Sequence, residues 1–122
     1  MSGIDYLADT NAILYFLSGN DCMKPYASAH FAFSVISEME LLSFPKITKE
    51  EELRIREFLE ASTSVSLTDA IKQRTIALRR AYNIKLPDAI IAASAIEQGL
   101  PLITADTGFE RIKELKLELI NP

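Results

Sequence analysis

Residues 84–96 read IKLPDAIIAASAI, a run of Ile, Leu and Ala that contains a single acid. Pro87 suits the first position of a helix and Gly99 suits a helix stop, so a helix is predicted from Pro87 to Gln98. Asp88 lies in the first turn, where a carboxylate offsets the positive end of the helix dipole. The positions three, four, seven and eight further on are all apolar: Ile91, Ala92, Ala95 and Ile96. We therefore expect Asp88 to lie on the buried face of this helix.

Outward from this helix, short apolar segments alternate with amphipathic ones along the whole chain. Strands are predicted at 4–9, 30–36, 64–67, 100–104 and 116–120, and helices at 11–20, 37–44, 48–62, 68–83, 87–98 and 109–115. Residues 21–29 are predicted as a loop. This alternation is typical of an α/β fold, here an α/β/α sandwich with a mostly parallel central sheet. The length and the lack of repeats or linkers predict one domain over residues 1–122.

The bulk composition excludes several classes of protein. No apolar run approaches the roughly 20 residues of a membrane-spanning helix, and the N-terminus does not resemble a secretory signal. Cys22 is the only cysteine, which rules out an internal disulfide and favours a reducing, cytoplasmic setting. The net charge of −4 is the opposite of that of most nucleic-acid binders, so the distribution of charge matters more than its sum.

Acids follow several of the predicted strands. Asp9 closes the first strand, and Asp106 comes two residues after the strand at 100–104. Glu38 and Glu40 come just after the second strand. In parallel sheets, sites form at the carboxyl ends of the strands, where helices begin. These acids and Asp88 are therefore expected to meet at one rim of the sheet.

Acids that meet at a partly buried rim resist ionising together, because each raises the pKa of the others. A divalent cation removes this conflict, and an all-oxygen set of ligands favours Mg²⁺ or Mn²⁺ over Zn²⁺. Such a site suits phosphodiester hydrolysis. Taken alone, each acid has a simpler interpretation as a turn or capping residue. Spacing also leaves open whether Glu38 or Glu40 belongs to the site.

Four segments together resemble the PIN-domain family, and the lack of further domains looks most like its VapC-type ribonuclease toxins. The segments are YLADTNAILYFL at 6–17, SVISEMELL at 34–42, LPDAIIAASAI at 86–96 and LITADTGF at 102–109. The resemblance covers nearly the whole chain. It implies a metal-dependent endoribonuclease, the toxin component of a type II toxin–antitoxin pair.

The resemblance also implies roles for individual residues. Within SVISEMELL, Glu40 matches the second acid of the family, since Leu41 follows it and Ser37 precedes it by three positions. The acids that match metal ligands, and so the catalytic set, are Asp9, Glu40, Asp88 and Asp106. Asn11 matches a residue that supports the site, and Thr104 matches a position on the site rim. Gly108 stands where many relatives carry another acid, which leaves open whether one or two metal ions bind.

In such proteins the acids hold Mg²⁺ or Mn²⁺, and metal-activated water attacks RNA to leave a 5′-phosphate and a 3′-hydroxyl. The resemblance further implies a homodimer and a small antitoxin that inserts a segment into a groove near the active site. Tyr15 and Phe16, in an almost wholly apolar helix, are candidates for one of these contacts.

The most basic stretch is KQRTIALRRAYNIK at 72–85, which contains no acid. Its cations are possible RNA contacts: Lys72, Arg74, Arg79, Arg80 and Lys85. A solvated helix face is the alternative interpretation.

Two other functions remain to be weighed against the nuclease. The same fold can serve as a non-catalytic module that binds RNA or protein, and the absent acid at Gly108 favours this alternative. A phosphatase or phosphotransfer receiver also places an Asp after its first strand, but it needs a Lys after a late strand, which this sequence lacks.

Overall fold

The central sheet has five strands, all parallel, in the order β3-β2-β1-β4-β5. The computed structural model describes residues 3–122, which contain all of these elements. The strands are β1 Tyr6–Ala8, β2 Phe31–Ser34, β3 Thr63–Val65, β4 Leu102–Thr104 and β5 Leu117–Leu119. The predicted α/β class with a parallel sheet is therefore confirmed.

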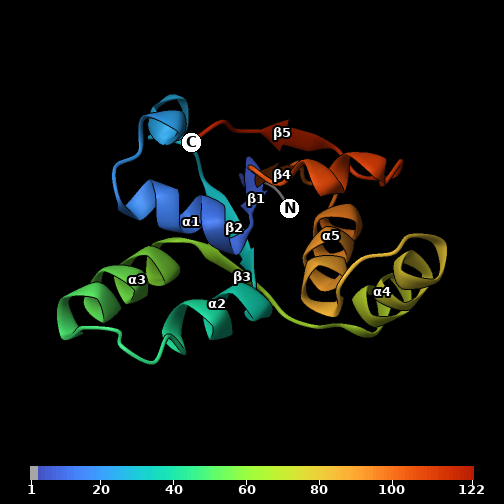
Figure 1. The fold of residues 1–122 in the computed structure, drawn as a ribbon, viewed down its shortest axis with the longest axis horizontal. Coiled ribbons are helices and arrows are strands. Elements are labelled where there is room, and N and C mark those ends of the chain that lie inside the picture. Colours follow the sequence, from blue (N-terminus) through green and yellow to red (C-terminus); the bar gives the residue numbers. More distant parts are fainter. Residues whose placement is uncertain (1–2) are drawn as a thin grey trace.

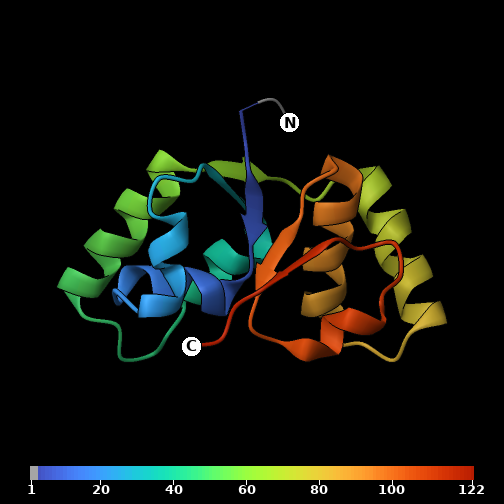
Figure 2. The same cartoon turned by 90° about the horizontal axis from the view of Figure 1, so that it is seen from above.

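Helices cover both faces of this sheet, which gives three layers (Figures 1 and 2). The α-helices are α1 Thr10–Leu17, α2 Val35–Leu42, α3 Lys49–Ala61, α4 Asp69–Ala81 and α5 Leu86–Gln98, and the short 3-10 helices are η1 Asp21–Tyr26 and η2 Thr107–Arg111. The first three α-helices pack on one face of the sheet, and α4 and α5 pack on the other. No helix within residues 3–122 has the length and apolar content that a membrane crossing requires.

Two hydrophobic cores lie on opposite faces of the sheet because successive strand residues point to opposite faces. In β1, Leu7 belongs to the core under α4 and α5, while Ala8 belongs to the core under α1, α2 and α3. In β4, Leu102 and Ile103 divide in the same way. Burial on both faces explains why these strands are almost wholly apolar.

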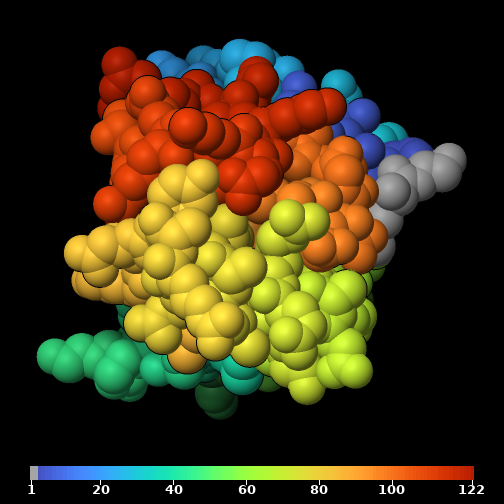
Figure 3. Space-filling model, turned by 90° about the vertical axis from the view of Figure 1, so that its right-hand side faces the viewer, coloured from blue at the N-terminus to red at the C-terminus, as the bar shows by residue number. Residues whose placement is uncertain are grey.

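Helix α5 is buried along most of its length, from Ala89 to Ala95. Helix α4 covers the outer side of α5, as Figure 3 shows from that side. The small side chains of α5 allow this close packing. The helix ends at Gly99, whose φ of 66° lies in the left-handed region that favours glycine. The stop predicted at Gly99 is therefore confirmed.

Three local predictions were wrong, and in each case a polar side chain decides the outcome. The segment predicted as a loop at 21–29 contains η1, which the side chain of Asn20 caps. The second strand ends at Ser34, whose hydroxyl accepts the N–H of Ile36 and so begins α2 two residues early. The helix predicted at 109–115 is the short η2, which begins after Asp106 and ends at Arg111, so that the chain can extend into β5.

Candidate functional site

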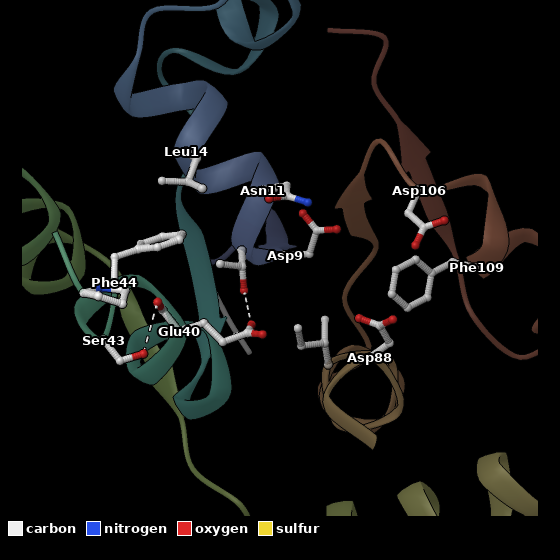
Figure 4. A pocket seen from close by; sticks show the side chains of 12 residues that line it. Asp9, Asn11, Leu14, Glu40, Ser43, Phe44, Asp88, Asp106 and Phe109 are labelled. Carbon is white, nitrogen blue, oxygen red and sulfur yellow. Dashed lines mark hydrogen bonds between the residues drawn. The ribbon is translucent and has the colours of Figure 1, made fainter. Parts of the chain in front are cut away.

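A cavity of about 380 Å³ opens at the carboxyl ends of the central strands (Figure 4). We call it the acidic cavity, and the residues that line it are Asp9, Thr10, Asn11, Leu14, Glu40, Ser43, Phe44, Pro45, Asp88, Ile91, Asp106 and Phe109. The structure thus brings the four predicted acids to one place. Glu38 does not line the cavity, so the structure places Glu40 rather than Glu38 beside the other acids.

Asp9 is the most buried of these acids, with 7% of its surface exposed. It follows β1 and caps α1, because its Oδ1 accepts the N–H of Ala12 at 2.8 Å. Its Oδ2 accepts the hydroxyl of Thr104. Burial raises the pKa of Asp9 above its ordinary value, against the lowering effect of these two hydrogen bonds, and the charges of Asp88 and Asp106 raise it further.

Glu40 reaches the cavity from the second turn of α2. The hydroxyl of Thr10 donates to its Oε1 at 2.6 Å, and the Oγ of buried Ser37 lies 2.9 Å from the same Thr10 oxygen. Since Thr10 has one hydroxyl proton, Ser37 supplies the proton for the second hydrogen bond. This chain of hydroxyls fixes one oxygen of an otherwise exposed carboxylate.

Asp88 is the third residue of α5 and is half-buried against the cavity, with Ile91 beside it in the lining. This agrees with the expectation that Asp88 faces inward. Burial raises its pKa first, and the charges of Asp106 and Glu40 raise it further, while Lys85 lowers it. The site therefore holds two carboxyls, Asp9 and Asp88, whose ionisation the fold disfavours.

Asp106 is exposed and caps the N-terminus of η2. Its Oδ1 accepts the N–H of Gly108 at 2.8 Å, and its own N–H donates to the Oγ1 of Thr104 at 3.0 Å. Thr104 is fully buried and does not line the cavity, so it lies beneath the site rather than on its rim. Its one hydroxyl joins Asp9 to the backbone of Asp106.

The ligand set suits a hard divalent cation, because every acid in the cavity offers carboxylate oxygens. Two of the four, Asp9 and Asp88, have pKa values raised in part by their acidic neighbours, a conflict that a cation would relieve. Within residues 3–122, however, no three Asp, Glu, His or Cys side chains are already close enough to form a metal-binding group. The four acids line one cavity, but their side chains do not converge on a single position.

Other predicted and unpredicted residues take their places around this cavity. Asn11 lines it and is exposed. Sequence reasoning missed Thr10 and Ser37, although both lie inside the motifs that carry Asp9 and Glu40. Tyr15 and Phe16 are both partly buried against the core, and Phe16 packs on the rings of Phe31 and Phe58.

The five cations of the basic stretch do not share one site in the structure. Lys72 pairs with Asp69, Arg74 pairs with Glu97, and Nε of Arg79 donates to the carbonyl of Ile84. Arg79 and Arg80 line a separate cavity further along α4. Among these five, Lys85 alone lines a cavity that shares acids with the acidic cavity.

Comparison with known families and structures gives consistent matches. The family described as PIN domain matches residues 6–115. A chain in a structure described as a toxin–antitoxin complex from Klebsiella pneumoniae is 34% identical, with a TM-score of 0.78 over 91% of this chain and 95% of that one. None of the curated proteins matches the chain.

Two further structures share the fold at lower identity. One is VapBC2 from Rickettsia felis bound to a DNA fragment from its promoter, with 23% identity and a TM-score of 0.81 over 97% of this chain and 100% of that one. The other is VapBC-1 from nontypeable Haemophilus influenzae, with 23% identity and a TM-score of 0.76 over 95% and 98%.

Proposed function

Because the chain belongs to the PIN-domain family, as the match over residues 6–115 shows, we propose that it is a metal-dependent endoribonuclease that hydrolyses RNA phosphodiester bonds. The structural matches, one of them to a chain in a toxin–antitoxin complex, support the resemblance to VapC-type proteins. The observation that carries the proposal is the acidic cavity, where four carboxylates line one space and two of them, Asp9 and Asp88, have raised pKa values.

In this proposal Mg²⁺ or Mn²⁺ is held by the four acids that line the cavity: Asp9, Glu40, Asp88 and Asp106. When bound, such a cation lowers the pKa of a water molecule and offsets charge on a phosphoryl group. Thr104 orients Asp9, and Thr10 orients Glu40, through the hydrogen bonds described above. Fixed orientation of ligands by a second layer of hydrogen bonds is a general requirement of metal sites.

We further propose that the protein is the toxin of a type II toxin–antitoxin pair, acts on RNA in the cytoplasm and forms a homodimer. An apolar groove of about 490 Å³ supports an antitoxin partner; its lining residues are Leu14, Phe44, Pro45, Lys46, Ile47, Glu51 and Ile55. Leu14, Phe44 and Pro45 also line the acidic cavity, so the groove leads into it. A partner segment seated in the groove would reach the proposed catalytic acids.

The nuclease proposal is tested with purified protein, Mn²⁺ and a long single-stranded RNA of mixed sequence. We expect cleavage that leaves 5′-phosphate ends, and Asp9→Asn or Asp88→Asn should reduce it by at least about 100-fold, because loss of several kcal/mol of charge stabilisation has this effect. Both variants keep the side-chain shape, and circular dichroism checks that they fold. Unchanged cleavage in both variants would show that the site is assigned wrongly.

One observation favours a second function, a non-catalytic module that binds RNA or protein. Within residues 3–122 the acids are not assembled into a ready metal group, and Gly108 contributes no carboxylate. Calorimetric titration with Mn²⁺ separates the two functions. The nuclease requires binding that Asp9→Asn weakens, whereas a folded protein that takes up no Mn²⁺ at millimolar metal would favour the binding module.

A further inference from the structure

A second cavity, of about 290 Å³, adjoins the acidic cavity. We call it the side cavity, and its lining residues are Asn83, Ile84, Lys85, Asp88, Asp106, Gly108, Phe109 and Arg111. Asp88, Asp106 and Phe109 line both cavities, so the two cavities are immediate neighbours. Figure 4 shows these three residues together on the side of the acidic cavity opposite Phe44.

We infer that Lys85 and Arg111 in the side cavity bind a backbone phosphate of the RNA next to the phosphate that is cleaved. This inference rests on the nuclease function proposed above and names two residues that position its substrate. Both side chains are exposed. They come from segments that meet only in the fold, since Lys85 precedes α5 and Arg111 ends η2.

Hydrogen bonds join the two chain segments that form the wall of the side cavity. An Nη2 donor of Arg111 bonds the carbonyl of Asn83, the hydroxyl of Tyr82 donates to Glu114 at 2.9 Å, and the N–H of Lys113 donates to the same hydroxyl at 3.3 Å. Figure 3 shows the two segments in contact, the yellow one near residue 80 and the orange-red one beyond residue 105. These bonds hold Arg111 beside the α4–α5 connection while using one of its five N–H donors.

The charges in this wall are available to a ligand. Within residues 3–122, neither Lys85 nor Arg111 forms an ion pair, whereas Lys72 and Arg74 on α4 are both paired. Gly108 adds no side chain to the wall. Among the described residues that line the side cavity, the carboxylates are Asp88 and Asp106, and Lys85 lies near enough to Asp88 to lower its pKa.

This arrangement separates two kinds of chemistry along one path. The acidic cavity, lined by four acids and no Lys or Arg, repels a phosphate until a cation is bound. The side cavity shares two of these acids but adds Lys85 and Arg111, whose positive charge and guanidinium donors suit a phosphate. An RNA strand laid across both cavities would place one phosphate at the acids and a neighbouring phosphate at Lys85 and Arg111. The pair thus positions the strand and does not take part in bond cleavage.

The test uses the full chain at saturating Mn²⁺ and mildly alkaline pH, so that removing the charge of Lys85 does not alter metal loading. A cleavage position is first mapped on a long mixed-sequence RNA, and a short fragment that spans it then serves for kinetics. Lys85→Ala and Arg111→Ala should each raise KM roughly fivefold, the upper value for an exposed ion pair, with kcat nearly unchanged. The double variant should lower the salt dependence of binding by roughly 0.7 in log–log slope, the value for one single-strand phosphate contact.

Two controls separate positioning from a structural role. Lys116→Ala removes an exposed cation outside the side cavity and should leave KM unchanged. Lys85→Arg and Arg111→Lys keep the charge and should restore most of the affinity. A neutral methylphosphonate is then placed at successive linkages of the fragment. At one flanking linkage it should raise the KM of the wild type. At that same linkage it should not raise the KM of the double variant any further.

Failure of this inference differs from failure of the nuclease proposal. If the wild type cleaves RNA and both alanine variants match its KM, the phosphate site alone is overturned. The same holds if a methylphosphonate at every position raises the KM of the double variant as much as that of the wild type. A wild-type protein that cleaves no RNA would overturn the nuclease. Fluorescence anisotropy with the labelled long RNA then judges the phosphate site: weaker binding by the double variant supports it, and equal binding or no binding overturns it.

Discussion

At the scale of single residues, the hydroxyl of Thr104 does more for the site than its position in the sequence suggests. It donates to Asp9 from 95 positions away and accepts the N–H of Asp106. One buried group therefore fixes two acids that follow different strands. Its hydrogen bond also lowers the pKa of Asp9 against the effect of burial, which keeps that carboxyl closer to the ionised form that binds metal.

Thr104→Val keeps the shape of the side chain but removes both hydrogen bonds. We expect Mn²⁺ affinity to fall by roughly 10–100-fold, as for other residues that orient metal ligands. Unfolding free energy should fall by about 1–3 kcal/mol, since the N–H of Asp106 and an oxygen of Asp9 lose partners. Calorimetry measures the first effect and urea denaturation the second. Thr104→Ser is the matched control and should recover most of both losses; equal losses in Ser and Val would point to packing instead.

Glu38 and Glu40 offer a matched pair on one helix, two residues apart. Glu40 lines the acidic cavity and accepts a hydrogen bond from Thr10, whereas Glu38 does neither. Glu40→Gln should therefore reduce RNA cleavage by at least about 100-fold, because a charged ligand is lost. Glu38→Gln should cleave at the wild-type rate in the same assay. Equal losses in the two variants would mean that the net charge of α2, and not ligation, matters.

At the scale of elements, α5 illustrates what a sequence pattern can predict. Pro87, the apolar positions and Gly99 were enough to predict the helix, its inward-facing acid and its end. The helix begins one residue early, at Leu86, with Lys85 as the capping position and Pro87 second. Burial along its whole middle was not predicted, because it depends on α4 covering the outer face.

The end of α5 gives a test that is independent of the metal site. Gly99→Ala forces a side chain into a left-handed conformation with φ of 66°, although no atom lies within 4 Å of the added Cβ. We expect a loss of about 1–2 kcal/mol of unfolding free energy from this conformation alone. Urea denaturation measures it, and Gly99→Asn should lose less because Asn tolerates this region better. Mn²⁺ affinity should stay unchanged, since Asp88 lies at the opposite end of the helix.

The rule that parallel strands carry sites at their carboxyl ends predicts one rim for Asp9, Asp106 and either Glu38 or Glu40. The inward face of its helix adds Asp88, and the family resemblance selects Glu40. The rule could not predict contacts that depend on the order of the strands in the sheet. The sheet order places β4 beside β1, which joins Thr104 to Asp9, and this order is not encoded in the periodicity of either strand. The hydroxyl chain from Ser37 through Thr10 to Glu40 and the meeting of Arg111 with Asn83 were missed for the same reason.

At the scale of the whole molecule, the two ends of the acidic cavity differ in chemistry. Apolar residues around Phe44 mark one end of the acidic cavity, and the side cavity with Lys85 and Arg111 adjoins the other. The net charge of −4 therefore describes the partner preferences of the protein poorly. Acids gather where a cation would bind, while positive charge lies beside them where a phosphate would follow.

The acidic cavity also makes the stability of the protein, and the stabilising effect of bound metal, depend on pH. In the folded metal-free protein the pKa values of Asp9 and Asp88 are raised above their ordinary value of 3.8. Their stabilising contribution is therefore complete below pH 3.8 and is lost as the pH rises through the raised values, because the unfolded chain ionises more readily. Metal binds the ionised carboxylates, so its stabilising effect should grow over the same interval.

Thermal unfolding of the full chain with and without Mn²⁺, measured across this pH range, tests the linkage. At near-neutral pH, free metal at 100 times its Kd should add about 2.7 kcal/mol, which is roughly 10 °C in Tm for a domain of this size. The increment should shrink towards zero as the pH falls and protons replace the metal at Asp9 and Asp88.

The double variant Asp9→Asn/Asp88→Asn should lose both the increment and the metal-free decline with rising pH, because its amides do not titrate. Glu38→Gln controls for the loss of an acid outside the cavity and should follow the wild type. A Tm increment that persists in the double variant would place the metal elsewhere on the molecule.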